Sequence, residues 1–412
     1  MSDKTLLKFE TNELKSLLAA RHFMHSKNIE IIDRKKKFSF DDSFIFEGKS
    51  FDCGYHAVDV GRSLVYNDIL TSLDIQWVKS QSTRSLVFNG KKYKGNYDFN
   101  ELESDFSFEN KNSYHGEFLK KLEVVYGSDF ITFAIENIAK SYTQNQLWIK
   151  GDLPDEIKLT NIYPWFFPFS SADNKGNMNE LRPHFHNDMT QDKTVRYPKE
   201  GSFMSITHAL RNELGSINFV PQDAEYQFAY FDDNGKVEVE ENTYHVWPIN
   251  YIDIASRFDL EFPDYVETSF YLVSVILNKP VNFEDHEILV GDKDYYIDRV
   301  SSPESLLGMQ SVSSLQFECE TLEHLDEEAI IDNIKSFTNR FFNNAPWESY
   351  NFKKVPLKRY NTKDIDKKLN KIITFVESRN PQTIILNRSF GMENLSEGIK
   401  NLVKKIGGVV GV

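Results

Sequence analysis

The sequence predicts an α/β protein that begins with a parallel sheet. Residues 4–9 form a short apolar run, residues 13–26 carry leucines at helical spacing, and residues 29–33 form a β-branched run that ends in an acid. A strand, a helix and a second strand of these sizes are typical of a βαβ unit. Because such a unit pairs its two strands in parallel, this opening predicts a parallel sheet.

Strands and helices alternate along the rest of the chain, which supports an α/β class with interleaved domains. Asn-Gly pairs predict hairpin turns, apolar runs predict buried strands, and apolar stripes at helical spacing predict helices. The expected elements are a hairpin at 85–95, helical structure at 116–145, long loops at 151–200, a helix at 202–215 capped by Ser202 and stopped by Gly215, a hairpin at 224–241, a buried strand at 268–278, and helices at 327–342 and 392–407.

The composition is that of a globular protein with a buried core. The 412 residues are 40% hydrophobic and 14% aromatic, which is enough for two domains of ordinary size. No apolar run approaches the length of a membrane span and no secretory signal is visible, so we expect a cytoplasmic chain. Cys53 and Cys319 are the only cysteines, which argues against a disulfide framework. The net charge of −14 argues against a nucleic-acid partner.

Several stretches follow one another in the order of the motifs of a known family. Residues 4–34 have the layout of a dinucleotide-binding unit, and FDCGYHAVD at 51–59 carries a Gly-x-His sequence after it. The later stretches are SYTQNQLW (141–148), FHNDMTQ (185–191), YPKEGSFMSITHAL (197–210) and SRNPQTIILNRSFGMENLSEGI (378–399). Taken in order, these stretches resemble the UDP-galactopyranose mutases and the related flavin-containing amine oxidases.

The resemblance implies an α/β fold with three parts. These are a Rossmann-like FAD/NAD(P)-binding domain, an interleaved sheet-based substrate domain and a small helical domain. On the sequence, we expect the Rossmann-like domain at 1–80, 200–260 and 375–412, a helical and loop insertion over the cleft at 81–199, and the substrate-type sheet domain with a helix at 261–374.

The resemblance also implies a reaction and a set of residues. In the mutases, reduced flavin attacks the anomeric carbon of UDP-galactopyranose, and the sugar opens and recloses as a furanose for surface polysaccharide synthesis. His56 would lie beside the flavin ring, and Arg379 or Arg299 near the phosphates, with His56 and Arg299 as catalytic residues. The implied cofactor contacts are Thr11, Glu13, Ser16, Asp33, Gly54, Arg379 and Met392, and the implied contacts to a nucleotide sugar are Tyr142, Trp148, Asn187 and Asp188.

The glycine fingerprint of dinucleotide-binding folds is absent from the opening unit. Its three positions hold Thr11, Glu13 and Ser16. Each glycine of that fingerprint is needed for a tight turn or a close backbone approach. A carboxylate about 4 Å from a phosphate costs roughly 4 kcal/mol at an effective dielectric constant near 20. Alternatively, Thr11 caps the helix and Glu13 complements the helix dipole, so that the helix fills its own anion site.

Two hypotheses therefore stand beside each other. The first is a flavoprotein enzyme that acts on a nucleotide sugar, with FAD bound in an altered way. The second is a flavin-less relative that binds a nucleotide sugar, a protein partner or a second copy of itself. The substrate motifs also depart from the family, since Thr190 and Asn145 replace a tyrosine and a lysine. Under the second hypothesis His56 is a structural histidine.

A metal site is a further alternative. His184, His186 and Asp188 have i, i+2, i+4 spacing, which on a strand directs all three side chains to one face. Two imidazoles and a carboxylate are suitable ligands for zinc or non-haem iron, and His208 or His245 could complete the set. This hypothesis competes with the mutase pattern, which uses Asp188 but neither His184 nor His186.

Overall fold

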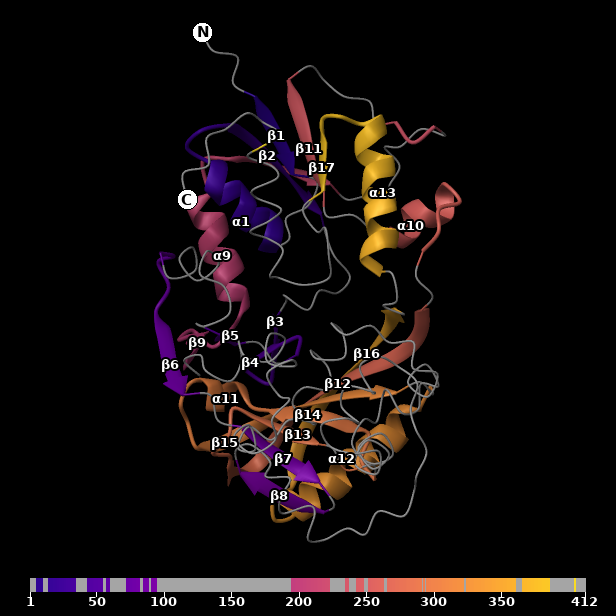
Figure 1. Cartoon of the computed structure of the whole chain (residues 1–412). Helices are drawn as coiled ribbons and strands as arrows, with labels where there is room; N and C mark the ends of the chain where they lie inside the picture. Colours follow the sequence, from indigo (N-terminus) through magenta and orange to yellow (C-terminus); the bar gives the residue numbers. More distant parts are fainter. Residues whose placement is uncertain are drawn as a thin grey trace, which may run out of the picture.

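Two sheets of different construction form the ends of the molecule (Figure 1). In this computed structural model, one is a five-stranded parallel sheet, the other a seven-stranded mostly antiparallel sheet, and two small sheets lie between them. The structure describes residues 5–9, 14–34, 43–54, 57–59, 72–81, 84–88, 90–94, 194–222, 234–236, 242–247, 251–262, 265–290, 292, 294–321, 324–360, 365–385 and 404.

The parallel sheet has the strand order β10-β2-β1-β11-β17. Every neighbouring pair in it is parallel, as the opening βαβ unit predicts. Lys8 interrupts the apolar pattern of the first strand, but it lies beside Glu30 on the next strand, and the two charges are 3.5 Å apart. The strands are β1 (Leu6–Phe9), β2 (Asn28–Arg34), β10 (Asn218–Gln222), β11 (Thr243–Trp247) and β17 (Thr383–Ile385).

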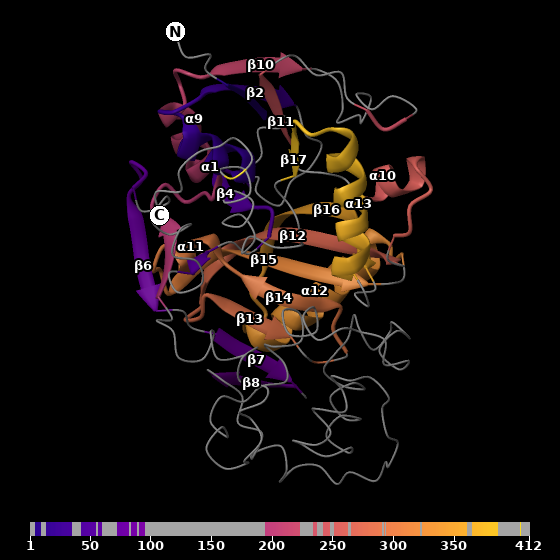
Figure 2. The same cartoon turned by 45° about the horizontal axis from the view of Figure 1, so that its top comes forward.

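Helices cover both faces of the parallel sheet (Figures 1 and 2). Helix α1 (Leu14–Phe23) and helix α9 (Met204–Glu213) bury one face, with Leu17, Ile206 and Ile384 in their shared core. Helices α10 (Tyr251–Arg257) and α13 (Ile365–Arg379) pack with Ile385 in a separate core. Because adjacent residues of a strand point to opposite faces, Ile384 and Ile385 place these helix pairs on opposite sides of the sheet.

The second large sheet has the order β16-β12-β15-β14-β13-β7-β8. All its pairs are antiparallel except the pair of β13 and β7. Helix α12 (Glu327–Phe341) covers one face with Ile330, Ile334 and Phe337. The strands are β7 (Arg84–Phe88), β8 (Lys91–Lys94), β12 (Tyr265–Asn282), β13 (Glu287–Val290), β14 (Ile297–Ser301), β15 (Ser311–Thr321) and β16 (Trp347–Tyr360).

The two small sheets occupy the space between the large ones in Figure 1. A hairpin joins β3 (Ser43–Phe46) to β4 (Lys49–Asp52). A three-stranded antiparallel sheet has the order β5-β9-β6. Its strands are β5 (Val58–Asp59), β9 (Thr194–Pro198) and β6 (Trp77–Gln81), and the short helix α11 (Pro303–Leu306) lies near β4.

Most elements expected from local pattern are confirmed where the structure describes them. The expected loops at 151–200 are wrong at their end, where Thr194–Pro198 form strand β9 by pairing with β5 and β6. The hairpin at 85–95 is β7 and β8, whose two-residue turn pairs Phe88 with Lys91. The helix at 202–215 is α9, the strand at 268–278 lies within β12, and the helix at 327–342 is α12. Ser202 does not occupy the N-cap position of α9, which is Phe203, but its hydroxyl accepts a hydrogen bond from the Met204 backbone at 3.2 Å.

Other expectations meet the structure only in part. Strands β7 and β8 belong to the seven-stranded sheet, although they fall in the expected insertion at 81–199. Helix α13 belongs with the parallel sheet and begins ten residues before the expected boundary at 375. The helical structure at 116–145 lies outside the described residues, as do most of the hairpin at 224–241 and of the helix at 392–407. Among the described residues, no helix has the length and apolar composition needed to cross a bilayer.

Candidate functional site

The carboxyl edge of the parallel sheet faces the rest of the molecule (Figure 1). Helix α1 follows β1 directly, and α9 runs back before β10, so both helices begin at this edge. Strand β1 pairs with β2 on one side and with β11 on the other, so successive strands are added first on one side of β1 and then on the other. Open parallel sheets bind ligands at the carboxyl ends of their strands beside such a switch point. This edge is therefore the candidate site.

Asp33 lies at the carboxyl end of β2, where dinucleotide-binding folds place the acid that holds a ribose. Its carboxylate accepts a hydrogen bond of 2.5 Å from Arg211 of α9. The Arg211 guanidinium also lies 4.9 Å from the centre of the Phe219 ring. About a third of each charged side chain is exposed, at 34% for Arg211 and 30% for Asp33. The acid is at the predicted edge, and a cation already pairs with it.

Ser16 takes the position of the third glycine of the fingerprint. It lies in α1 and has no exposed surface. The third glycine permits close packing between the helix and the strand, and serine is small enough to keep that packing. Thr11 and Glu13, at the other two positions, lie outside the described residues.

A buried turn at Asp52–Gly54 connects the parallel sheet to the other layers. The Asp52 carboxylate accepts hydrogen bonds from the Ser43 hydroxyl at 2.6 Å, the Tyr197 hydroxyl at 2.6 Å and the Phe203 backbone at 2.8 Å. The Phe203 N–H lies at the start of α9, so Asp52 acts as a cap at the carboxyl edge. On the other side, Gln316 of β15 donates to the Asp52 carbonyl at 2.7 Å.

Gly54 follows this anchor in a conformation that few other residues adopt. Its φ is +121°, outside the left-handed helical region, and the residue is buried. Such a φ favours glycine because a side chain would clash with the backbone. The Gly-x-His stretch therefore begins with a fixed turn at the junction of α9, β9 and β15. His56 lies outside the described residues, and its position beside a flavin stays a prediction.

Burial and the Asp52 charge set the protonation of Tyr197. Burial raises the pKa of Tyr197 well above its usual value, and the Asp52 charge and hydrogen bond raise that pKa further. Tyr197 is thus a neutral donor at every physiological pH. The Asp52 charge is in turn held by three donors at a helix start, where an anion is stabilised.

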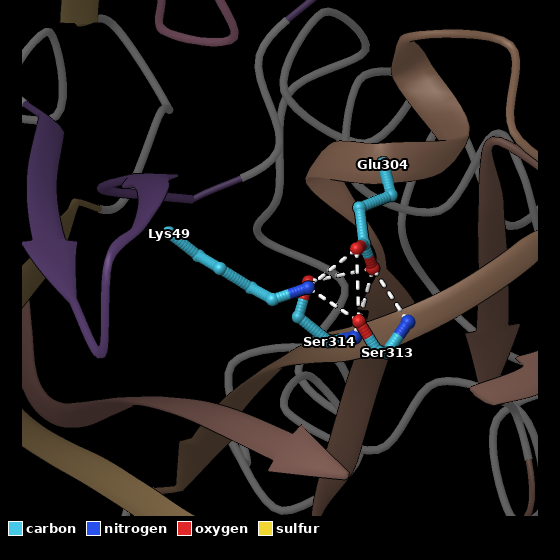
Figure 3. Close-up of polar contacts among 4 residues, drawn as sticks. All are labelled: Lys49, Glu304, Ser313 and Ser314. Carbon is cyan, nitrogen blue, oxygen red and sulfur yellow. Dashed lines mark hydrogen bonds and ion pairs between the residues drawn. The ribbon is translucent and has the colours of Figure 1, made fainter. Parts of the chain in front are cut away.

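A second polar cluster fixes the hairpin of β3 and β4 to the seven-stranded sheet (Figure 3). Glu304 of α11 accepts hydrogen bonds from the backbone of Ser313 at 2.6 Å and of Ser314 at 2.9 Å, and it pairs with Lys49. Burial alone would raise the pKa of Glu304, but the hydrogen bonds from Lys49 and Ser313 outweigh it, so that this pKa lies below its usual value. The hairpin that leads into Asp52 is therefore held at both ends.

The two predicted phosphate ligands lie elsewhere. Arg299 of β14 pairs with the buried Glu287 at 2.9 Å and with Glu318 at 3.3 Å, so two carboxylates already compensate its charge. Arg379 ends α13, just before β17 begins, which places it at the amino edge of the parallel sheet. It stacks on Phe375 at 3.8 Å. A ligand at the carboxyl edge would not reach Arg379 there, because the ligand and Arg379 occupy opposite edges. We therefore leave both arginines out of the candidate site.

The remaining predicted residues lie outside the part of the chain that the structure describes. These are His56, Tyr142, Trp148, His184, His186, Asn187, Asp188 and Met392. Of the two further candidate metal ligands, His208 is exposed on α9 and His245 is buried on β11. The described residues contain no group of three side chains that could hold a metal ion. The metal site at His184, His186 and Asp188 stays a prediction.

Comparisons with known proteins agree with this architecture. No family model matches the chain, and no curated protein matches it by sequence. A crystal structure of reduced UDP-galactopyranose mutase matches with a TM-score of 0.65 at 13% identity, over 99% of this chain and 94% of that one. An oxidoreductase from Methanosarcina mazei matches with a TM-score of 0.52 at 12% identity, over 97% of this chain and 100% of that one. A putrescine oxidase with redesigned cofactor binding matches with a TM-score of 0.52 at 9% identity, over 98% of this chain and 99% of that one.

These likenesses define the fold. The chain has the mixed α/β fold of the FAD-dependent oxidoreductases, with a parallel sheet and a separate, mostly antiparallel sheet. Of the three solved structures named, the UDP-galactopyranose mutase gives the highest TM-score and is the protein that the ordered sequence stretches resemble. At identities of 9–13%, these matches support a shared fold and nothing further.

Proposed function

We propose that this chain binds FAD at the carboxyl edge of the parallel sheet and acts on a nucleotide sugar, as a relative of the UDP-galactopyranose mutases. The observation that carries the proposal is the Gly54 turn. Asp52 holds this turn against the start of α9, so the Gly-x-His stretch leaves from the edge where the fold binds dinucleotides. A glycine at such an edge lets the backbone approach a ligand closely, because it has no side chain.

The described residues fit a bound FAD in three respects. Asp33 is at the strand end where this fold places the acid that binds the ribose, Ser16 puts a small, buried side chain at the third fingerprint position, and Gly54 brings backbone without a side chain to the same edge. These residues would hold the cofactor together with Thr11 and Met392, and the Glu13 carboxylate would have to lie away from the phosphates. The flavin, when bound, would supply a nucleophilic ring nitrogen for the sugar.

The chain itself would bind and orient the substrate. We assign to Tyr142 and Trp148 the stacking surface for the uracil, and to Asn187 and Asp188 the hydrogen bonds to the sugar. His56 would hold or pass on a proton at its imidazole beside the ring, a role that histidine side chains commonly serve in active sites. The fixed turn at Gly54 would set the position of that imidazole, because only one residue separates the two.

Flavin binding tests the proposal directly. We expect the purified protein to show the visible absorption of oxidised flavin, or to gain it when FAD is added. Asp33→Asn should weaken FAD binding about tenfold, which corresponds to roughly 1.4 kcal/mol for one lost charged contact. Glu30→Gln is the matched control, since Glu30 lies on the same strand but pairs with Lys8. A colourless wild type that does not bind added FAD would refute the proposal.

One observation favours a second candidate, a flavin-less relative that binds a nucleotide sugar. Arg211 already pairs with Asp33, so the acid carries a cation where FAD would present its ribose. Titration of the colourless protein with UDP-galactose, followed by calorimetry, separates the two candidates. Binding of the sugar nucleotide without FAD supports the second, and binding only after FAD is added supports the first.

A further inference from the structure

The small sheet β5-β9-β6 has one face that the candidate site uses and one that it does not. Val195 and Tyr197 of β9 are buried, and Tyr197 points to Asp52. Ser80 of β6 lies on the same side and bonds to His286 at 2.7 Å. Because neighbouring residues alternate between faces, Arg196, Trp77 and Lys79 share the opposite face. Strand β6 lies at the outer side of the molecule in both views (Figures 1 and 2).

That opposite face gathers donors without acceptors. Arg196 pairs directly across the strands with Lys79, and Trp77 lies two residues before Lys79 on the same strand. The Arg196 Nε and the Trp77 Nε1 are both buried from solvent, and neither has a hydrogen-bond acceptor. Lys79 is exposed and Arg196 is half-buried. Within the described part of the chain, no carboxylate pairs with either cation.

Such an arrangement is unfavourable unless something completes it. Like charges directly opposite each other on antiparallel strands are destabilising, because their β-carbons are only about 5 Å apart. Buried N–H groups are nearly always hydrogen-bonded in folded proteins, and an unmet one is costly. Water could satisfy the indole N–H, but it would not offset two adjacent cations. An anion would do both.

We propose that Arg196, Lys79 and Trp77 form a binding site for a phosphate group. A guanidinium, an ammonium and an indole N–H present donors from three side chains, which suits an ion with several acceptor oxygens. A carboxylate offers only two oxygens, whereas a phosphate offers three or four. The site uses none of the residues assigned to the dinucleotide edge: Tyr197, which bonds to Asp52, projects from the other face of β9, and Trp77 packs against the hydrophobic core that α1 and α9 share. It therefore does not depend on the proposed function.

Calorimetric titration with sodium phosphate at low ionic strength tests the site, with sodium chloride at equal ionic strength as the reference. We expect the wild type to bind phosphate, Arg196→Met to bind it at least tenfold more weakly, and Lys79→Gln several-fold more weakly. Lys199→Gln is the matched control, since Lys199 follows the same strand but bonds to Gln76 at 3.2 Å. Asp33→Asn should leave phosphate binding unchanged, because it belongs to the other site.

A second measurement, thermal unfolding, begins without any ligand. In phosphate-free buffer, Arg196→Met should melt at the same temperature as the wild type or higher, because it removes an unpaired buried donor; added phosphate should then raise the melting temperature of the wild type only. Parallel titration of the wild type and of Arg196→Met with UDP identifies the source of the phosphate. UDP can also bind at the proposed nucleotide-sugar site, so only the UDP binding that Arg196→Met removes is assigned here: if it is tighter than the binding of inorganic phosphate it indicates a nucleotide, and if it is equal it indicates the free ion. No binding of either by the wild type, or equal binding by Arg196→Met, would overturn the proposal.

Discussion

Asp52 and Asp33 lie at the same edge of the parallel sheet, but their carboxylates have different surroundings. Asp52 is 4% exposed and accepts hydrogen bonds from three residues on separate elements. The Asp33 side chain is 30% exposed and pairs with one arginine. A buried carboxylate with every donor in place fixes structure, whereas an exposed ion pair contributes little and can exchange its partner. Asp52 therefore holds the structure of this edge, and Asp33 is the residue at which a ligand can compete with Arg211.

Replacement of Asp52 should give the largest effect on stability. Asp52→Ala leaves the Tyr197 hydroxyl, the Ser43 hydroxyl and the Phe203 N–H without their acceptor. We expect the free energy of unfolding to fall by about 3–5 kcal/mol, because each buried donor left without its acceptor costs about 1–3 kcal/mol. Urea unfolding measures it, with Asp33→Ala as the control at about 1 kcal/mol or less. Equal losses for the two variants would contradict the comparison.

The Glu304 cluster should give an intermediate effect that depends on pH. The pKa of Glu304 is lower in the folded chain than in the unfolded chain, because Lys49 and Ser313 hydrogen-bond to the charged form. The unfolded chain therefore takes up this proton first as pH falls. The stability that Glu304 contributes is present above its unfolded pKa and is lost as pH falls through its folded pKa.

Glu304→Gln should remove that part of the acid dependence. We expect it to lower the free energy of unfolding at neutral pH by about 1.5–3 kcal/mol, the usual range for hydrogen bonds to a charged group. The difference from the wild type should shrink as the pH falls below the folded pKa. Chemical unfolding at several pH values measures this slope. Glu261→Gln is an exposed comparison. Hydrogen bonds from Lys371 and Lys368 also lower the pKa of Glu261, but the pair lies at the surface, so its effect on stability should be smaller. A difference that does not change with pH would count against the assigned role of Glu304.

The sequence predicts the elements here better than it predicts the contacts between them. The spacing of apolar residues gives β1, α1 and β2, and Asn89-Gly90 gives the hairpin of β7 and β8, because these signals are local. Asp52 is different: Tyr197 and Phe203, which donate to it, are 145 and 151 residues away. Arg211 likewise lies 178 residues from Asp33. No local period links such residues, so neither partner set could be read from the chain alone.

The two arginines show that a resemblance in sequence also fails to predict long-range contacts. Arg299 and Arg379 are assigned to phosphates by their place in a resembling sequence, yet the fold gives one to a pair of carboxylates and the other to the far edge of the sheet. Asp33 keeps its expected place because its sequence position within Asn28–Arg34 determines which end of β2 it occupies. A residue's position along a strand can thus be predicted, whereas the partners of a long side chain depend on tertiary packing.

The smallest change in stability should accompany the most informative change in binding. Arg211→Met removes the cation from Asp33, and the pair is exposed enough that we expect a loss of about 0–1 kcal/mol in the free energy of unfolding. If Asp33 holds a ribose hydroxyl, that hydroxyl must compete with the Arg211 guanidinium. Removal of the guanidinium should therefore tighten FAD binding severalfold. Arg21→Met is the matched control, because Arg21 of α1 pairs with Glu213 of α9 and does not contact Asp33. Weaker FAD binding by Arg211→Met would instead make the arginine a ligand for the cofactor, and Asp33 its positioning residue.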